Sequence, residues 1–342
     1  MRVITWLLAA ITTTGIVARL LPVSLSDLPF LPILAAVTPL YAATAALALA
    51  LTLALAPRAW RHRRVSRHII RIVAAAALAL EALWLAPLAS PSSRVEAAQA
   101  NGDAASLRVM TCNVYKGAAS AGDIVAAVRE QHVQVLALQE TTVPFVDALK
   151  AAGLDELLPY SERSSSDGVY GNGVWSALPL ADVASDDIGS SASAMPAGTV
   201  DVTRADGSVA RVRLVSVHTC SPQPGYWGLW RRSVEEIGVV RARLAAAGSP
   251  GYVLLGDFNA TYDHAPFRAM LGEGKADGLP TLHDAAREAG QGLVPTWPSG
   301  GAVPALCGID HVVTSDGVAA TDLQTLAIPG SDHAALLATL VV

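Results

Sequence analysis

The sequence predicts an α/β domain of two packed sheets with helices outside, preceded by three membrane-spanning helices. Residues 28–57 carry no charged side chain, and this stretch exceeds the roughly 20 apolar residues that a helix needs to cross a bilayer. After residue 106, short apolar runs with strand-like alternation recur between segments of helical spacing. The net charge also changes along the chain. Residues 1–100 contain nine Lys and Arg and three Asp and Glu, a net charge of +6, whereas residues 101–342 contain 15 Lys and Arg and 26 Asp and Glu, a net charge of −11. The chain therefore joins two different kinds of polypeptide.

Two further apolar segments flank the uncharged stretch, at residues 3–18 and 72–89. The first ends at Arg19, whose long side chain can reach a membrane interface, and the second is interrupted only by Glu81. A cleaved signal peptide is the alternative for the first segment, but no small-x-small cleavage site follows it. Glu81 would serve either helix packing or function inside a membrane. Residues 1–89 are thus predicted to form a membrane domain with three transmembrane helices.

A cationic run at residues 58–67 separates the second and third predicted spans. Cytoplasmic loops are enriched in Lys and Arg, so this run favours a multi-pass protein of the cell membrane with its N-terminus and residues 57–71 in the cytoplasm. The run could instead bind nucleic acid, but its place between two spans favours the topological interpretation. Everything after residue 89 is then extracytoplasmic.

The remaining chain divides into a linker and a large domain. Residues 90–106 are small, polar and aperiodic, which predicts a flexible linker. Residues 107–342 begin with a strand at 107–114, a helix at 123–132 and a strand at 135–138. Further strands are expected at 173–178, 200–203, 209–218, 252–256, 309–314 and 334–341, with a helix at 227–247.

The three cysteines, Cys112, Cys220 and Cys307, all lie in the part predicted to face outward, where disulfides are permitted. A bridge between Cys220 and Cys307 and three free thiols are both compatible with the sequence.

Six polar clusters lie at the ends of predicted strands. They are Thr111-Cys112-Asn113, Leu138-Gln139-Glu140, Ser216-Val217-His218, Gly256-Asp257-Phe258-Asn259, Asp310-His311 and Ser331-Asp332-His333. Carboxylates and amides without a thiolate cluster favour a hard divalent cation, Mg²⁺ with Mn²⁺ as a second option, over zinc. Two imidazoles, His218 and His333, add a proton acceptor for water and a donor to a developing phosphorane charge. The combination predicts attack of water on a phosphate ester.

Through these motifs, residues 107–342 resemble the endonuclease/exonuclease/phosphatase superfamily. The resemblance implies a four-layered α/β sandwich with a catalytic site at one end. It also implies that one or two metal ions are held principally by Glu140, with Asn113 and Asp332 holding or orienting the ion.

The resemblance assigns roles to the other matched residues. His333 would be the general base, Asp310 would bond its imidazole, and Asp257 would orient the attacking water. Asn259 and His218 would donate to the phosphate oxygens. In some relatives the duties of Asp257 and His333 are argued the other way round, so both assignments stay open.

Substrate contacts are less completely matched. The segment Gly171-Asn172-Gly173-Val174-Trp175-Ser176 resembles a Gly-Asn-x-x-x-Ser segment of the superfamily and makes Asn172 a substrate-binding candidate. Before Asp310 the chain has Cys307-Gly308 where relatives are often basic. A cation for the phosphate would therefore come from Lys116 or Arg231.

Taken whole, the chain resembles the VanJ-like membrane proteins linked to glycopeptide and teicoplanin resistance. This implies action on a lipid-linked phosphate at the outer membrane face, with undecaprenyl pyrophosphate or a related cell-wall lipid as the leading candidate. Aromatic and cationic residues at 224–232 also favour a lipid headgroup, with the alternative that Trp227, Leu229 and Trp230 only begin a packed helix. The alternatives are an extracellular metal-dependent nuclease and a sphingomyelin-type phosphodiesterase. The charge of −11 opposes a nucleic acid partner, and no protein partner is implied.

Overall fold

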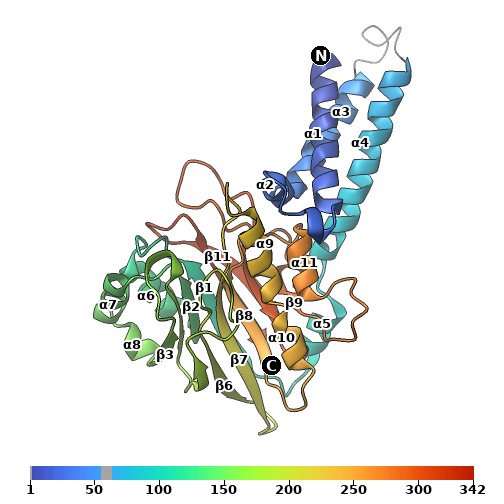
Figure 1. Ribbon diagram of the computed structural model, residues 1–342. Helices are drawn as coiled ribbons and strands as arrows, with labels where there is room; N and C mark the ends of the chain where they lie inside the picture. The colour runs from blue at the N-terminus through green and yellow to red at the C-terminus, as the bar shows by residue number, and fades with distance from the viewer. Residues whose placement is uncertain (1, 55–63) are drawn as a thin grey trace.

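The computed structural model describes residues 2–54 and 64–342, so residues 57–63 of the predicted cytoplasmic loop lie outside the described residues. Within them, the C-terminal domain contains two six-stranded sheets packed face to face (Figure 1). The first has the order β11-β12-β1-β2-β4-β3, with β1 at Ser106–Asn113, β2 at Val135–Gln139, β3 at Tyr160–Arg163, β4 at Asn172–Ser176, β11 at Ala319–Ala327 and β12 at Ala334–Val341. The second has the order β5-β6-β7-β8-β10-β9, with β5 at Ala181–Ala184, β6 at Ala197–Thr203, β7 at Val209–His218, β8 at Gly251–Asp257, β9 at His283–Asp284 and β10 at Asp310–Thr314.

Strand direction brings the polar strand ends together. β1 and β2 are parallel, as are β7 and β8, so these strands finish at one end of their sheets. β12 runs antiparallel to β1 and β10 antiparallel to β8, so both begin where their partners finish. In this register His218 is opposite Asp257, and Asp257 is opposite Asp310.

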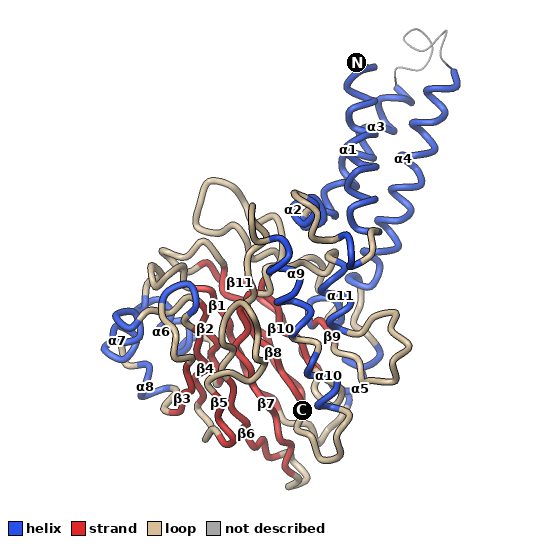
Figure 2. Tube along the Cα trace, in the orientation of Figure 1, coloured by secondary structure: helices blue, strands red, loops and turns tan. Residues whose placement is uncertain are grey.

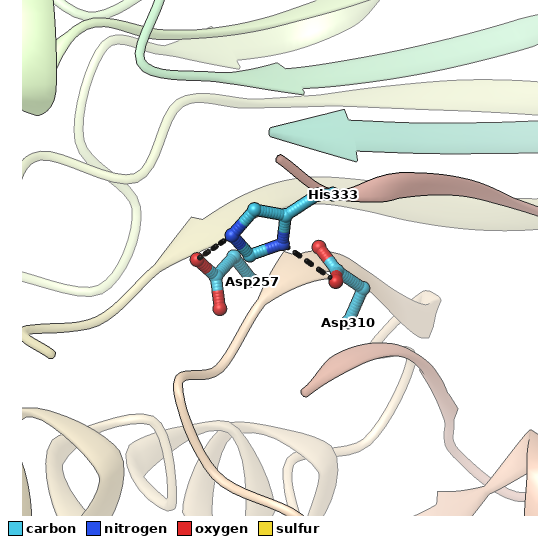
Figure 3. Close-up of side chains that lie close together, drawn as sticks. All are labelled: Asp257, Asp310 and His333. Carbon is cyan, nitrogen blue, oxygen red and sulfur yellow. Dashed lines mark hydrogen bonds and ion pairs between the residues drawn. The ribbon is translucent and has the colours of Figure 1, made fainter. Parts of the chain in front are cut away.

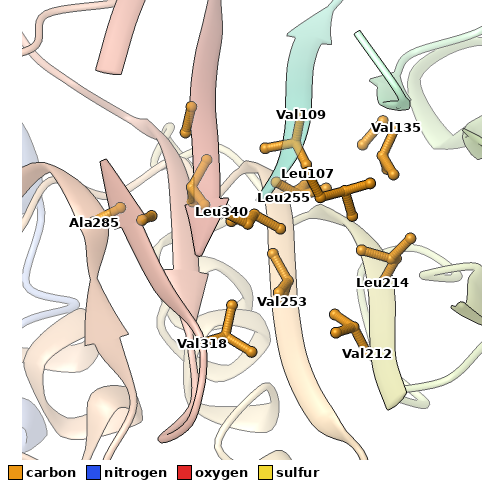
Figure 4. Packing of buried hydrophobic residues seen from close by; sticks show 14 of the residues in the cluster. Leu107, Val109, Val135, Val212, Leu214, Val253, Leu255, Ala285, Val318 and Leu340 are labelled. Atoms are coloured by element: carbon orange, nitrogen blue, oxygen red, sulfur yellow. The ribbon is translucent and has the colours of Figure 1, made fainter. Parts of the chain in front are cut away.

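Apolar side chains fill the space between the sheets (Figure 4). Val109 and Val135 from one sheet pack in the same cluster as Leu214, Val253 and Leu255 from the other. Alternate residues of a strand point to opposite faces, so the other apolar residues of the same strands face outward. Burial of each Val or Leu side chain stabilises the fold by about 1.5–3 kcal/mol.

Helices cover both outer faces and complete the α/β sandwich. On the β1–β2 sheet they are α6 at Ala121–Glu130, α7 at Val143–Ala151 and α8 at Leu154–Leu157; on the β7–β8 sheet they are α9 at Trp227–Glu236, α10 at Val239–Leu244 and α11 at Ala265–Leu271; α12 at Ala285–Glu288 adjoins β9. The helix predicted at 227–247 is thus two helices, α9 and α10. The two-sheet architecture with outer helices is as predicted.

The N-terminal part is a bundle of α1 at Arg2–Leu20, α3 at Tyr41–Ala54 and α4 at Arg64–Leu85, with the short helix α2 at Leu31–Ala36 at its base (Figure 2). Two helical segments of the described chain, Val3–Leu20 and Val65–Ala100, are long and apolar enough to cross a membrane, and the helix at Thr38–Ala54 is shorter. A core helix or a signal sequence satisfies the same criterion, so three transmembrane helices are not confirmed. The uncharged stretch predicted as one span is broken: α2 ends at Ala36, and Pro39, which lacks a backbone donor, lies in a separate 3-10 turn.

The prediction of a flexible linker is wrong for residues 93–100. Residues 93–100 form the helix α5 (Ser93–Ala100), whose first turn is capped by the Ser92 hydroxyl. The Arg94 guanidinium donates to the carboxylate of Glu288 at 2.7 Å and to the carbonyl oxygen of Val318 at 2.6 Å. These contacts of Arg94 hold the segment against the C-terminal domain. They join residues far apart in the sequence, so local composition does not predict them.

The cysteines Cys112, Cys220 and Cys307 all have free thiols. The bridge considered between Cys220 and Cys307 is absent from the described chain.

Candidate active site

Side chains from both sheets meet at the end of the sandwich where β1, β2, β7 and β8 finish. Asn113 ends β1, Glu140 follows β2, His218 ends β7 and Asp257 ends β8, while Asp310 begins β10 and His333 precedes β12. With Asn259, just after β8, these residues are called the catalytic cluster below. Buried polar groups require partners, and here they are partners of one another.

Asp257 is the centre of the catalytic cluster. The Asn113 amide donates to Asp257 Oδ2 at 3.1 Å and to Glu140 Oε1 at 3.2 Å, which joins the two carboxylates. Asn259 donates its backbone N–H to Asp257 Oδ1 at 2.7 Å and its side-chain amide to Oδ2 at 3.2 Å. Burial raises the pKa of Asp257, although the nearby His333 acts in the opposite direction.

His333 lies between two carboxylates (Figure 3). Its Nδ1 is 2.9 Å from Asp310 Oδ2, and its Nε2 is 3.8 Å from Asp257 Oδ2. Burial alone would lower the pKa of His333, but the charges of Asp310 and Asp257 outweigh burial and raise the pKa to about 10. Without a cation nearby, this imidazole is therefore protonated at neutral pH.

The pKa of His218 is shifted in the opposite direction from that of His333. Its Nε2 is 3.7 Å from Asp257 Oδ2 and 3.9 Å from Glu140 Oε1. Burial nevertheless lowers its pKa, so the ring is neutral at pH 7. Its buried Nδ1 has no hydrogen-bond partner of normal geometry among the described residues.

Two overlapping donor sets at this site fit a divalent cation. Glu140 and Asp257 offer carboxylate oxygens, the type of ligand that hard cations prefer, and the Asn113 amide nitrogen donates to both. Asp257, Asp310 and His333 offer ligand atoms within 4.8 Å of one another. The Glu140 side chain is 15% exposed whereas that of Asp310 is fully buried, so the set that includes Glu140 is the more open one. Asp332, beside His333, adds a buried Oδ1 without a partner among the described residues.

Asn172 approaches the catalytic cluster through one intermediary. Its side-chain amide donates to the Ala194 carbonyl at 2.7 Å and to the Ser193 hydroxyl at 3.3 Å, and Ser193 in turn donates to the His218 carbonyl at 2.6 Å. Asn172 Oδ1 is buried and unpartnered among the described residues. Asn172 is thus linked to His218 through Ser193, and its Oδ1 is an acceptor without a partner among the described residues.

Lys116 and Arg231, the two predicted cations, are placed differently. The backbone N–H of Lys116 donates to Glu140 Oε2 at 3.0 Å, so this lysine borders the cluster. Arg231 is a correction: its guanidinium pairs with Asp27 and Glu235, each at 2.9 Å. Those carboxylates come from the N-terminal segment and from α9 itself, so Arg231 joins the two parts of the protein.

Three supporting residues were given no role in the sequence analysis. Ser331 Oγ accepts from the His333 backbone at 3.0 Å and donates to the Asn113 carbonyl at 2.7 Å, linking two strands. Thr296 Oγ1 accepts from the Asp310 backbone at 3.3 Å, and Ser193 supports His218. Ser331 belongs to the predicted Ser331-Asp332-His333 cluster, whereas Thr296 and Ser193 lie in loops without a local signal.

Comparisons with known proteins agree with this geometry. The family model described as "Endonuclease/Exonuclease/phosphatase family" matches residues 110–333. Among solved structures, TDP2 of D. rerio, complexed with single strand DNA product, is 16% identical with a TM-score of 0.53, over 69% of this chain and 99% of that one. TDP2 of Caenorhabditis elegans is 19% identical with a TM-score of 0.52, over 69% and 98%. An endonuclease/exonuclease/phosphatase of Bacteroides vulgatus is 17% identical with a TM-score of 0.52, also over 69% and 98%. No curated protein matches the chain.

Proposed function

The chain belongs to the endonuclease/exonuclease/phosphatase family, whose members are metal-dependent phosphoester hydrolases, and we propose that it hydrolyses a lipid-linked phosphate at a membrane surface. The observation that carries the proposal is the catalytic cluster, which lies at the end of the sandwich that the N-terminal bundle contacts. Undecaprenyl pyrophosphate or a related cell-wall lipid is the leading substrate.

The catalytic cluster supports hydrolysis of a phosphate ester by water. A divalent cation bound beside Glu140 would neutralise charge on the phosphate oxygens. The pKa directions favour the second of the two role assignments: Asp257, with its raised pKa, accepts the proton of the attacking water, and protonated His333 donates to a phosphate oxygen. Asp310 orients the His333 ring, and Asn259 holds Asp257.

The surface of the N-terminal bundle supports membrane insertion. Large apolar side chains face outward, among them Leu7, Leu47 and Ile72, which are 56%, 50% and 68% exposed. Small residues, including Ala48 and Ala74, fill the interior. Large residues outside and small ones inside are typical of helices packed within lipid. In water, so much exposed apolar surface would favour aggregation.

The loops beside the site contact the base of the N-terminal bundle. The loop after β7 leads to Trp227, whose ring centroid is 5.8 Å from that of Phe30. The loop after β8 leads to His264, whose Nε2 is 2.8 Å from the Pro32 carbonyl oxygen. A site held at this end is close to lipid headgroups, which raises its effective concentration toward a lipid phosphate.

The alternative of a nuclease draws on the D. rerio TDP2 fold, which was solved with single strand DNA product. The charge of −11 after residue 100 opposes it, because non-specific binding of nucleic acid depends on a basic surface. A sphingomyelin-type phosphodiesterase is the third candidate. We also propose that the chain is related to the VanJ-like membrane proteins. Its hydrolysis of a cell-wall lipid would then contribute to glycopeptide resistance.

A parallel substrate assay tests the function. The full-length protein in lipid nanodiscs is offered undecaprenyl pyrophosphate, sphingomyelin, and single- and double-stranded DNA, with Mg²⁺, with Mn²⁺ and with EDTA. We expect cation-dependent phosphate release from the lipid pyrophosphate. Glu140→Gln should lower kcat by about 100-fold or more, while Glu130→Gln, at the exposed end of α6, leaves it unchanged. Faster cleavage of DNA than of lipid would reject the lipid substrate.

A further inference from the structure

A cavity of about 230 Å³ lies between the base of the N-terminal bundle and the C-terminal domain. Trp84 and Leu85 of α4, with Leu88 just beyond it, line one side, and Leu293 and Leu306 of the C-terminal domain also line it. The same region of the fold is where the bundle joins the sandwich beside α9 and α11 (Figure 1). We call this space the junction cavity.

The lining of the junction cavity suits hydrocarbon better than an anion. Its apolar lining comes from both parts of the protein, whereas Glu81, Asp263 and Asp284 contribute carboxyl groups. One lining cation, Arg287, has its guanidinium 4.1 Å from the Tyr262 ring centroid and donates to the Trp84 carbonyl oxygen at 3.1 Å. A phosphate is therefore disfavoured here, since four carboxyl groups, those three and that of Asp310, line the cavity with one engaged guanidinium.

The junction cavity adjoins the catalytic cluster. Asp310 lines the cavity, together with Cys307 and Gly308, the segment that leads into β10. Through Oδ2, Asp310 also holds the imidazole of His333. Asp310 therefore belongs both to the lining of the junction cavity and to the catalytic cluster.

We propose that the junction cavity binds the hydrocarbon chain of the substrate next to its phosphate. This inference rests on the proposed function and specifies how that site would select a lipid. At about 230 Å³, the cavity is below the roughly 300–1,000 Å³ of pockets for drug-sized ligands. It therefore receives only the first carbons of a long chain, and the remainder lies in the bilayer along the exposed apolar faces of the bundle.

The test narrows the cavity from each side. Ala36→Trp acts from α2 and Ala305→Trp from the loop before β10, both at residues that line the cavity. Ile33→Trp is the matched control, because Ile33 is on α2 but 50% exposed and outside the lining. Each full-length variant in nanodiscs is assayed with a long-chain prenyl pyrophosphate and with methyl pyrophosphate, which is water-soluble and has no chain that could enter the cavity.

We expect both cavity variants to raise KM for the long-chain substrate by about tenfold, the effect of losing contact with two carbons. The kcat/KM for methyl pyrophosphate should stay within about twofold of the wild-type value, and Ile33→Trp should change neither the KM for the long-chain substrate nor this kcat/KM. Equal losses with both substrates, or the same loss in the control, would overturn the inference. Failure of the wild-type protein to hydrolyse either compound would instead reject the proposed function.

A photoreactive group on the first carbons of the long-chain substrate gives a readout without catalysis. In wild-type protein, crosslinks mapped by mass spectrometry should fall on residues 84–88 or 293–306. Crosslinks elsewhere would contradict the proposed position of the chain, whether or not the tryptophan variants fold.

Discussion

At the scale of single residues, two members of the catalytic cluster have backbone dihedral angles that residues other than glycine rarely adopt. Glu140 has a φ of +59° and Asn259 one of +47°, and neither is glycine. A left-handed conformation costs an L-residue about 1–2 kcal/mol. Hydrogen bonds offset this cost, including those from Asn259 to both oxygens of Asp257. Residues held in such strained conformations gather at functional sites, which agrees with the position of these two beside Asp257.

His333 offers a prediction about pH in metal-free protein. Its pKa, raised to about 10 by Asp310 and Asp257, exceeds the value of about 6.5 for an unfolded chain. The protonated ring therefore stabilises the fold fully below about pH 6.5, and this contribution disappears as the pH rises through about 10. NMR titration of the ring with EDTA present should show the high pKa.

Asp310→Asn removes the charge beside His333 Nδ1 and should lower that pKa. Asp284→Asn is the control, because Asp284 makes the equivalent 3.0 Å contact with His311 instead. An unperturbed His333 titration in wild-type protein would contradict the proposed influence of Asp310 and Asp257 on this imidazole.

At the scale of elements, the contact between β7 and β8 depends on a glycine. Gly256 has a φ of +152°, and a Cβ there would lie 2.0 Å from the Val217 carbonyl oxygen. Neither the backbone conformation nor the space admits a side chain. The glycine thus sets how closely β8 approaches β7 directly before Asp257.

Gly256→Ala should lower Tm more than Gly207→Ala and should also reduce hydrolysis, because the strand must shift next to Asp257. Gly207 is the matched control, with a φ of +82° and nothing within 4 Å of an added Cβ. It bears only the conformational cost of about 1–2 kcal/mol. Thermal unfolding in nanodiscs measures both variants, and equal Tm losses would show that the close contact is unimportant.

The strands that the sequence predicted are those with buried apolar runs. β7, β8, β10 and β12 were expected within one or two residues of their observed bounds. β3 and β5 were missed because their residues are exposed or only partly buried, so no apolar pattern marks them. β11 was missed because polar residues interrupt it and its register shifts between Thr321 and Gln324.

At the scale of the molecule, the bundle and the sandwich form one connected structure. Arg19 of α1 forms an ion pair with Asp263 at 3.0 Å, and both side chains are largely buried. Its guanidinium also lies 3.9 Å from the Trp84 ring centroid. An uncompensated buried charge is costly, so breaking these contacts is unfavourable. They restrict movement of the bundle relative to the sandwich.

The predicted topology can be measured on the whole chain. Alkaline phosphatase fused after Val342 should be active, because the positive-inside rule keeps the basic residues 58–67 in the cytoplasm and directs the C-terminal domain outward. A fluorescent protein that folds only in the cytoplasm, fused at the same position, is the control and should remain dark. The reverse pattern would invert the topology.

The sequence by itself determined the chemistry of the site: which carboxylates, amides and imidazoles follow which apolar runs. Strand periodicity and polar strand ends are local properties, so Asn113, Glu140, His218, Asp257, Asp310 and His333 could be named without coordinates. Only the tertiary structure decided what these residues meet. Arg231 pairs with Asp27, 204 residues away, and Arg94 with Glu288, 194 residues away. Such pairs, like the junction cavity, arise when whole surfaces pack together, and no local pattern encodes them.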